Sequence, residues 1–82
     1  MSRNSLRSTS ADPRLAVGQV VYLSEPLAQF GLGRGAVGAI VMVFTSPLLA
    51  YEVEFVDDHG ETRALATLRP EQISATAPTA VT

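Results

Sequence analysis

The side chains best suited to chemistry lie in the segment Asp57-Asp58-His59-Gly60-Glu61, where the only histidine sits among three carboxylates. Carboxylates ligate metal ions, and both groups act as acids and bases in catalysis. The same residue types are favoured in tight turns, and no second group of ligands occurs elsewhere in the chain. The chain has one histidine and no cysteine, and no set of nucleophile, base and orienting residue is evident around that histidine. We therefore expect a solvated turn, with no metal site, no catalytic residue and no enzymatic activity. A metal-assisted hydrolase at this turn is a minor alternative.

The stretch Gly33-Arg34-Gly35-Ala36-Val37-Gly38 has the spacing of a dinucleotide-binding GxGxxG motif, with Glu52 and Glu54 about 20 residues later. That chemistry requires a strand before the glycines and the N-terminus of a helix after them, where free amides meet the pyrophosphate. Here a β-branched stretch follows the glycines. We expect no cofactor, and we expect the glycines to let a long loop fold back and the next strand begin with a bend.

The elements that position these residues are predicted to be strands, because β-branched and aromatic residues cluster between proline and glycine breaks. The predicted strands cover residues 17–23, 37–44, 50–56 and 61–67, and one helical turn with a short closing strand follows within residues 68–73. Curling into a barrel would remove the exposed edges of such a sheet. We predict an all-β fold, a small SH3-like barrel of about five antiparallel strands over residues 16–74, with disordered tails at residues 1–15 and 75–82.

Residues 57–60 contain turn formers and a glycine, which predicts a tight hairpin between the third and fourth strands. If the turn spans these four residues, large apolar side chains face small ones inside and opposite charges face each other outside. The predicted pairs are Phe55 with Thr62, Val53 with Ala64, and Glu54 with Arg63.

Charge is distributed unevenly along the 82 residues. Residues 15–82 contain three arginines and seven carboxylates, a net charge of −4, whereas residues 1–14 carry +2. Nucleic-acid binding relies on basic side chains, so the acidic body disfavours a nucleic-acid partner. The longest apolar run, residues 36–44, is far shorter than the roughly 20 residues of a membrane-spanning helix. The first ten residues do not resemble a secretory signal, and we expect a soluble, cytoplasmic protein.

The second predicted strand is apolar on both faces, and the loop after it carries leucines where polar residues are usual. A bend at a bulge could bury both faces of the strand within the barrel. Alternatively, apolar side chains left in water mark an interface. We predict that Met42, Leu48 and Leu49, flanked by Glu52 and Glu54, contact another protein chain or a second copy of this one.

The folded stretch resembles a small bacterial family known as domain of unknown function 4926. The resemblance rests on Val20-Val21-Tyr22-Leu23, residues 31–41, residues 51–57, Gly60-Glu61-Thr62 and residues 67–73. It implies an SH3-like barrel and no established activity. At Met42, Leu48 and Leu49 the chain differs from the family pattern, in which polar residues are typical. The segment from Gly35 to Ile40 also resembles the KOW motif of ribosome-associated barrels, without their basic residues.

These observations lead to two alternative functions. The first is a non-enzymatic protein-interaction module: a self-associating unit, an accessory subunit, or an antitoxin or immunity protein by analogy with small families of this kind. The second is a KOW-like domain that associates with RNA or the ribosome through the basic N-terminal segment and Arg34. The two differ in salt dependence, because electrostatic binding to RNA weakens steeply as salt rises.

Overall fold

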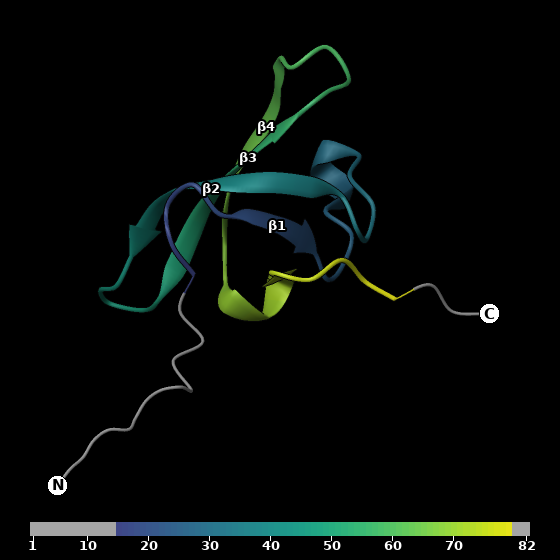
Figure 1. The fold of residues 1–82 in the computed structure, drawn as a ribbon. Helices are drawn as coiled ribbons and strands as arrows, with labels where there is room; N and C mark the ends of the chain where they lie inside the picture. Colours follow the sequence, from purple (N-terminus) through teal and green to yellow (C-terminus); the bar gives the residue numbers. More distant parts are fainter. Residues whose placement is uncertain (1–14, 80–82) are drawn as a thin grey trace, which may run out of the picture.

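A computed structural model gives the structure of the protein and describes residues 15–79. It contains five strands, β1 (Val20–Leu23), β2 (Val37–Phe44), β3 (Ala50–Val56), β4 (Thr62–Leu68) and β5 (Ile73–Ser74), and two 3-10 helices, η2 (Ala28–Phe30) and η3 (Pro70–Gln72) (Figure 1). Every strand pair is antiparallel. The prediction of an all-β fold with five antiparallel strands is confirmed. Of the tails predicted to be disordered, residues 1–14 and 80–82 lie outside the described residues, and residues 75–79 are described and belong to no helix or strand.

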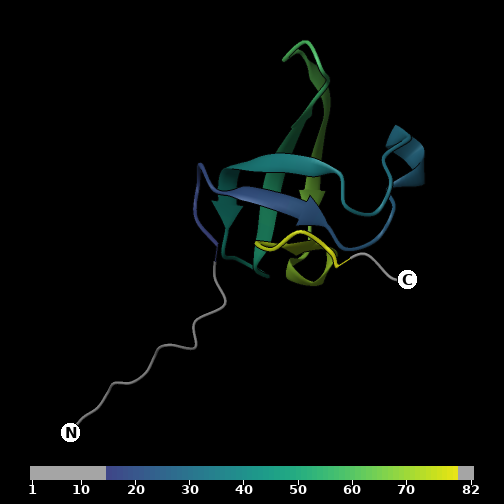
Figure 2. The ribbon, with the colours of Figure 1, turned by 45° about the vertical axis from the view of Figure 1, so that its right-hand side comes forward.

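The strands form one sheet in the order β4-β3-β2-β1-β5. The sheet coils strongly, so β1 runs across the direction of the β3–β4 hairpin (Figure 2). In the described part of the chain β4 and β5 are the two edges of an open sheet, joined through η3 and not by a ladder of hydrogen bonds. The SH3-like classification therefore remains a prediction, while the curling that we expected is present as the coil of this sheet.

The first strand begins three residues later than predicted. Residues 16–19 form a turn instead, in which the amide of Gln19 donates to the carbonyl of Ala16 over 3.0 Å. Gly18 has a φ of 91°, a conformation that continues no β-strand. The described helices are both single 3-10 turns, and neither has the length or the apolar character to cross a membrane.

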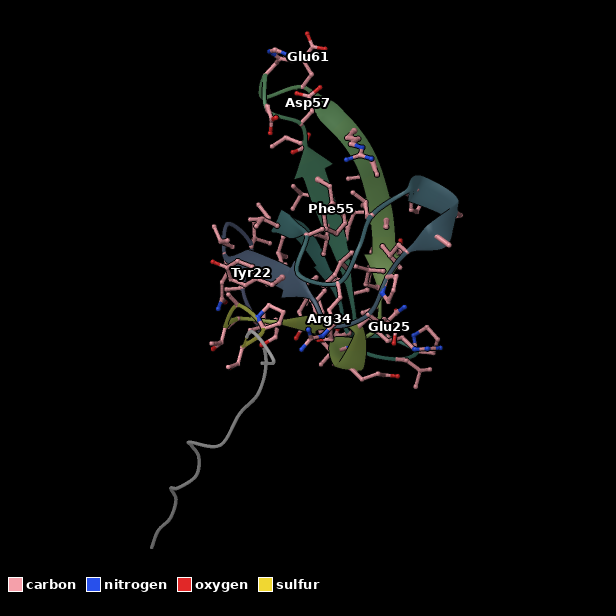
Figure 3. All side chains as sticks on the ribbon, turned by 90° about the vertical axis from the view of Figure 1, so that its right-hand side faces the viewer. Tyr22, Glu25, Arg34, Phe55, Asp57 and Glu61 are labelled. Carbon is pink, nitrogen blue, oxygen red and sulfur yellow. The ribbon has the colours of Figure 1, made fainter. Side chains whose placement is uncertain are left out.

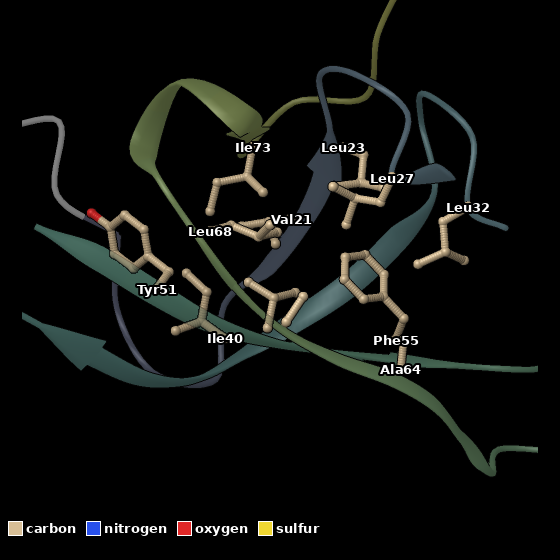
Figure 4. Packing of buried hydrophobic residues seen from close by; sticks show 12 residues of the cluster. Val21, Leu23, Leu27, Leu32, Ile40, Tyr51, Phe55, Ala64, Leu68 and Ile73 are labelled. Carbon is tan, nitrogen blue, oxygen red and sulfur yellow. The ribbon is translucent and has the colours of Figure 1, made fainter. Parts of the chain in front are cut away.

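The concave face of the sheet holds one hydrophobic core, in which Tyr51 lies at one end and Leu32 at the other (Figure 4). Its twelve buried members are Val21, Leu23, Leu27, Leu32, Ile40, Tyr51, Val53, Phe55, Ala64, Ala66, Leu68 and Ile73. Alternation along β3 and β4 points every second side chain inward, as the sequence pattern of β3 predicted. In the part of the chain that the structure describes, these side chains fill the concave face of the sheet.

Gly38 allows β2 to approach the core closely. A Cβ atom at this position would lie 2.6 Å from Cγ1 of Val53 and 2.9 Å from Cε1 of Phe55. The contact distance between carbon atoms is about 3.5–4.0 Å, so any side chain would collide with both residues. We expected this glycine to permit a bend, and the structure shows that close packing against β3 is what requires it.

The long connection between β1 and β2 is attached to the core by two leucines. Leu27 and Leu32 exchange backbone hydrogen bonds of 2.8 and 3.2 Å, and both side chains are buried. The turn between them contains η2 and ends at Gly31, whose φ is 67°. The loop therefore folds back on itself, as predicted, and covers one end of the core.

The register of the β3–β4 hairpin differs from the prediction by two residues. Phe55 faces Ala64, Val53 faces Ala66 and Glu54 faces Leu65. A bulge between Phe55 and Val56 adds a residue to one side of the ladder, and the turn is correspondingly offset. The predicted pairing of Glu54 with Arg63 is therefore wrong, and the Arg63 guanidinium instead donates to the carbonyl of Gly31 over 3.2 Å.

Candidate interaction surface

The cluster around the only histidine is a turn organised by Asp57. Its Oδ1 accepts the backbone amides of His59 and Glu61, at 2.8 and 3.0 Å, and Gly60 occupies the left-handed region at a φ of 81°. The tip projects from the far end of the β3–β4 hairpin (Figure 3). Within residues 15–79 no three His, Cys, Asp or Glu side chains are grouped closely enough to hold a metal ion. The Asp57 carboxylate is engaged in forming the turn.

The glycine-rich stretch leads into a strand. The amide of Gly35 donates to the carbonyl of Leu23 over 2.8 Å, and β2 begins two residues later at Val37. Gly38 therefore lies within a strand, where its backbone is part of the ladder to β1 and β3. Residues 15–79 also enclose no pocket. Any binding by the described part of the chain must use an outer surface.

A bulge in β2 determines which of its apolar side chains face outward. The pairing with β3 shifts between Ile40 and Met42, so that Val41 is an extra residue. Before the bulge Ile40 points into the core, and after it Val43 packs against the core. Val41 and Met42 both stay exposed. The bend at a bulge that we considered as an alternative is present, and it buries only part of the apolar set.

The strand pairs around β2 bring four exposed apolar side chains onto the convex side of the sheet. Val20 of β1 lies on the same side, because its neighbour Val21 points into the core. Val37 is on this side for the same reason, since the adjacent Gly38 packs inward, and it pairs with Tyr22. We call Val20, Val37, Val41 and Met42 the β1–β2 apolar face. Their exposed fractions run from 41% for Val41 to 53% for Val37.

Two carboxylates border this face. Glu52 pairs with Met42 and Glu54 with Ala39, so both acids project from the outer side of β3 beside the apolar residues. Each is half-buried and accepts a hydrogen bond from a threonine of β4: Thr67 Oγ1 donates to Glu52 Oε1 over 2.5 Å, and Thr62 Oγ1 donates to Glu54 Oε2. Among residues 15–79 the single ion pair joins Arg69 to Glu71, so neither acid has a cationic partner there.

The five residues predicted to bind a partner are divided by the structure. Met42, Glu52 and Glu54 lie together on the outer face of β2 and β3. Leu48 is 75% exposed in the loop between these strands, whereas Leu49 is half-buried and packs against the core. Sequence reasoning missed Val20 and Val37, because their place beside Met42 depends on the register between β1 and β2. The alternation within each strand could have indicated their outward direction.

The protein was compared with known families, curated proteins and solved structures. A family described as "Domain of unknown function (DUF4926)" matches residues 18–75. The matched range covers all five strands, and with them the apolar face and its two carboxylates. No curated protein and no solved structure matches the chain.

Proposed function

The chain belongs to this family of unknown function, and the family indicates no activity. From the surface of the protein we propose that it is a non-enzymatic module that binds another protein. The binding surface in this proposal is the β1–β2 apolar face with Glu52 and Glu54 at its border. By analogy with other small families, the module acts as an accessory subunit or as a neutralising partner of the antitoxin or immunity kind.

The observation that carries the proposal is the continuous apolar surface over two paired strands. Each of its four side chains is about half exposed. Fully burying such a side chain stabilises by about 1.5–3 kcal/mol, so covering each half that remains contributes about 1 kcal/mol. Contiguous apolar surface of this kind is typical of protein interfaces, particularly where polar residues surround it.

The cations of the folded body give less support to RNA binding. Arg69 pairs with Glu71 at 2.9 Å, and Arg63 donates to a backbone carbonyl, which leaves only Arg34 of the three arginines in the described residues. Binding to RNA requires basic groups that are available to phosphates. The described residues therefore support protein binding better than RNA binding.

The test compares two double variants of the full chain. Val37→Thr with Met42→Gln makes the face polar, while Val37→Ile with Met42→Leu keeps it apolar. Both positions are half exposed, so the variants should remain folded, with a loss of stability of no more than about 1 kcal/mol at each position. Each tagged variant is used to capture proteins from the native cells, and bound proteins are quantified by mass spectrometry.

We expect the same partner to be retained by wild type and by the apolar variant, and reduced at least roughly tenfold by the polar variant, which corresponds to about 1.4 kcal/mol. Part of its retention should persist at high salt, because apolar contacts are not screened, whereas the contribution of Glu52 and Glu54 weakens as salt rises. Equal capture by the polar and apolar variants would contradict the proposal. Retention of RNA that disappears with salt would support the KOW-like alternative instead.

A further inference from the structure

The outer face of the sheet has an apolar half over β1 and β2, and a half over β3 and β4 that carries Glu52, Glu54 and the exposed Leu65, which pairs with Glu54. The apolar face occupies β1 and β2, and Glu52 and Glu54 project from the next strand, β3. Neighbouring strands are about 4.8 Å apart, so the two halves lie within about 10 Å of each other. A single partner element lying along β2 would therefore contact both.

The two carboxylates are held in fixed positions and have no cation to neutralise them. A threonine hydroxyl of β4 donates to one oxygen of each carboxylate, and this hydrogen bond restrains the glutamate side chain. The second oxygen of each glutamate has no protein partner among residues 15–79. Arg63, the one basic residue of β4, is turned to the carbonyl of Gly31. A half-buried carboxylate gains most from a cation that arrives with the partner, because the partner also excludes water.

The charge of the protein indicates which partner fits. Residues 15–79 carry three arginines against seven carboxylates, a net charge of −4. A second copy placed on the same face would bring like charges together, including two more glutamates, which disfavours self-association there. A partner that carries positive charge would instead be attracted to this face.

Resting on the proposed function, we propose that this face binds a basic amphipathic helix of a partner protein, with its apolar stripe on the β1–β2 apolar face and two of its cations on Glu52 and Glu54. The two glutamates are two residues apart on one strand, a spacing of about 6.6–6.8 Å. Cations four residues apart on a helix are separated by about 6 Å along its axis, which matches this spacing. A helix about 10 Å wide also spans the distance from β1 to β3.

The experiment measures binding of a labelled synthetic peptide to the full chain by fluorescence anisotropy. The peptide has about 18 residues, enough for a stable helix, with a leucine stripe and arginines four residues apart along one flank. A matched peptide carries glutamine in place of each arginine. The protein variants are Glu52→Gln with Glu54→Gln, and, as a control with the same change of charge, Asp58→Asn with Glu61→Gln at the exposed hairpin tip.

We expect the arginine peptide to bind the Glu52/Glu54 variant about two- to thirty-fold more weakly than wild type, the effect of losing two ion pairs near the surface. The hairpin-tip variant should weaken binding less than the Glu52/Glu54 variant does, because Asp58 and Glu61 lie beyond the hydrogen-bonded Thr62–Glu54 pair and charges outside the contact are partly screened at physiological salt. The glutamine peptide should bind wild type and the two charge variants equally.

Several results would overturn the proposal. If both peptides bind wild type equally, or if the two charge variants weaken binding alike, the partner is not recognised by its cations at Glu52 and Glu54. The polar variant Val37→Thr with Met42→Gln is measured in the same assay. If it alone weakens binding, the apolar face is the binding surface but the partner is not basic. If it has no effect, the proposed function fails at this face. If wild type is a dimer that the polar Val37/Met42 variant dissociates, the face binds a second copy of the chain instead. If the variant Arg3→Gln with Arg7→Gln binds the peptide more tightly, the face binds the chain's own N-terminal segment.

Discussion

Replacing Gly38 by alanine should destabilise the protein, although the change adds only one methyl group. The new Cβ would lie 2.6 Å from Val53 Cγ1, 2.9 Å from Phe55 Cε1 and 3.0 Å from the carbonyl oxygen of Glu54. Val53 and Phe55 are fully buried, so neither can turn aside into solvent. Adding a methyl group to a well-packed core costs about 1–3 kcal/mol. A glycine-to-alanine change that strains nothing stabilises by about 0.4–1 kcal/mol, which leaves a net loss of about 1–2 kcal/mol.

The loss is measured by thermal unfolding followed by circular dichroism, together with urea unfolding. For a domain of this size 1 kcal/mol corresponds to about 4–8 °C, so we expect Gly38→Ala to lower the Tm by about 4–16 °C. Gly33→Ala is the matched control, because its Cβ would have no atom within 4 Å and the residue is not in the left-handed region. That variant should be unchanged or slightly stabilised. If Gly38→Ala is as stable as wild type, the close contact between β2 and β3 is not present.

Two further predictions concern single side chains. Tyr51→Phe should destabilise by about 0.5–1.5 kcal/mol in urea unfolding, because the buried Tyr51 hydroxyl accepts the amide of Leu15 over 3.0 Å; no loss would show that this hydrogen bond contributes nothing. Leu48→Ser should change the free energy of unfolding by less than about 0.5 kcal/mol, since Leu48 is 75% exposed. Leu49→Ser should destabilise the protein more, because Leu49 packs against the core. Equal effects of the two variants in the same assay would contradict this placement.

Local sequence predicted the two central strands well. The predicted ranges 37–44 and 50–56 coincide with β2 and β3. In both, β-branched and aromatic residues are bounded by residues that cannot continue a strand, and these preferences act within a few residues of the chain. The inward direction of Tyr51, Val53 and Phe55 also followed from simple alternation.

The register of the β3–β4 hairpin could not be predicted in the same way. The sequence offered a four-residue turn that paired Glu54 with Arg63. That pairing is wrong because five residues, 57–61, separate the two strands and because Arg63 is an extra residue of β4 at the bulge opposite Phe55 and Val56. A bulge costs little locally and is selected by how well the whole set of inward side chains packs. In the observed register, small residues lie opposite large ones and leave space for them: Ala64 is opposite Phe55, and Ala66 is opposite Val53.

The candidate surface depended even more on long-range structure. Met42, Glu52 and Glu54 were predicted to lie together, and they do, because adjacent strands place them there. Val20 and Val37 join them only through the pairing of β1 with β2, and Leu49 leaves the predicted set because the loop folds it against the core. Whether these residues bind a partner is what the proposed experiments decide.

The sequence alone determined the all-β character of this protein, the position of its main strands and the acidity of its body, since strand preference, alternation and charge are properties of short stretches of chain. The tertiary structure decided which apolar side chains remain outside, where the carboxylates lie relative to them, and why Gly38 must be a glycine. These depend on register and on contacts between residues distant in the chain, and such contacts are selected by the packing of the whole core.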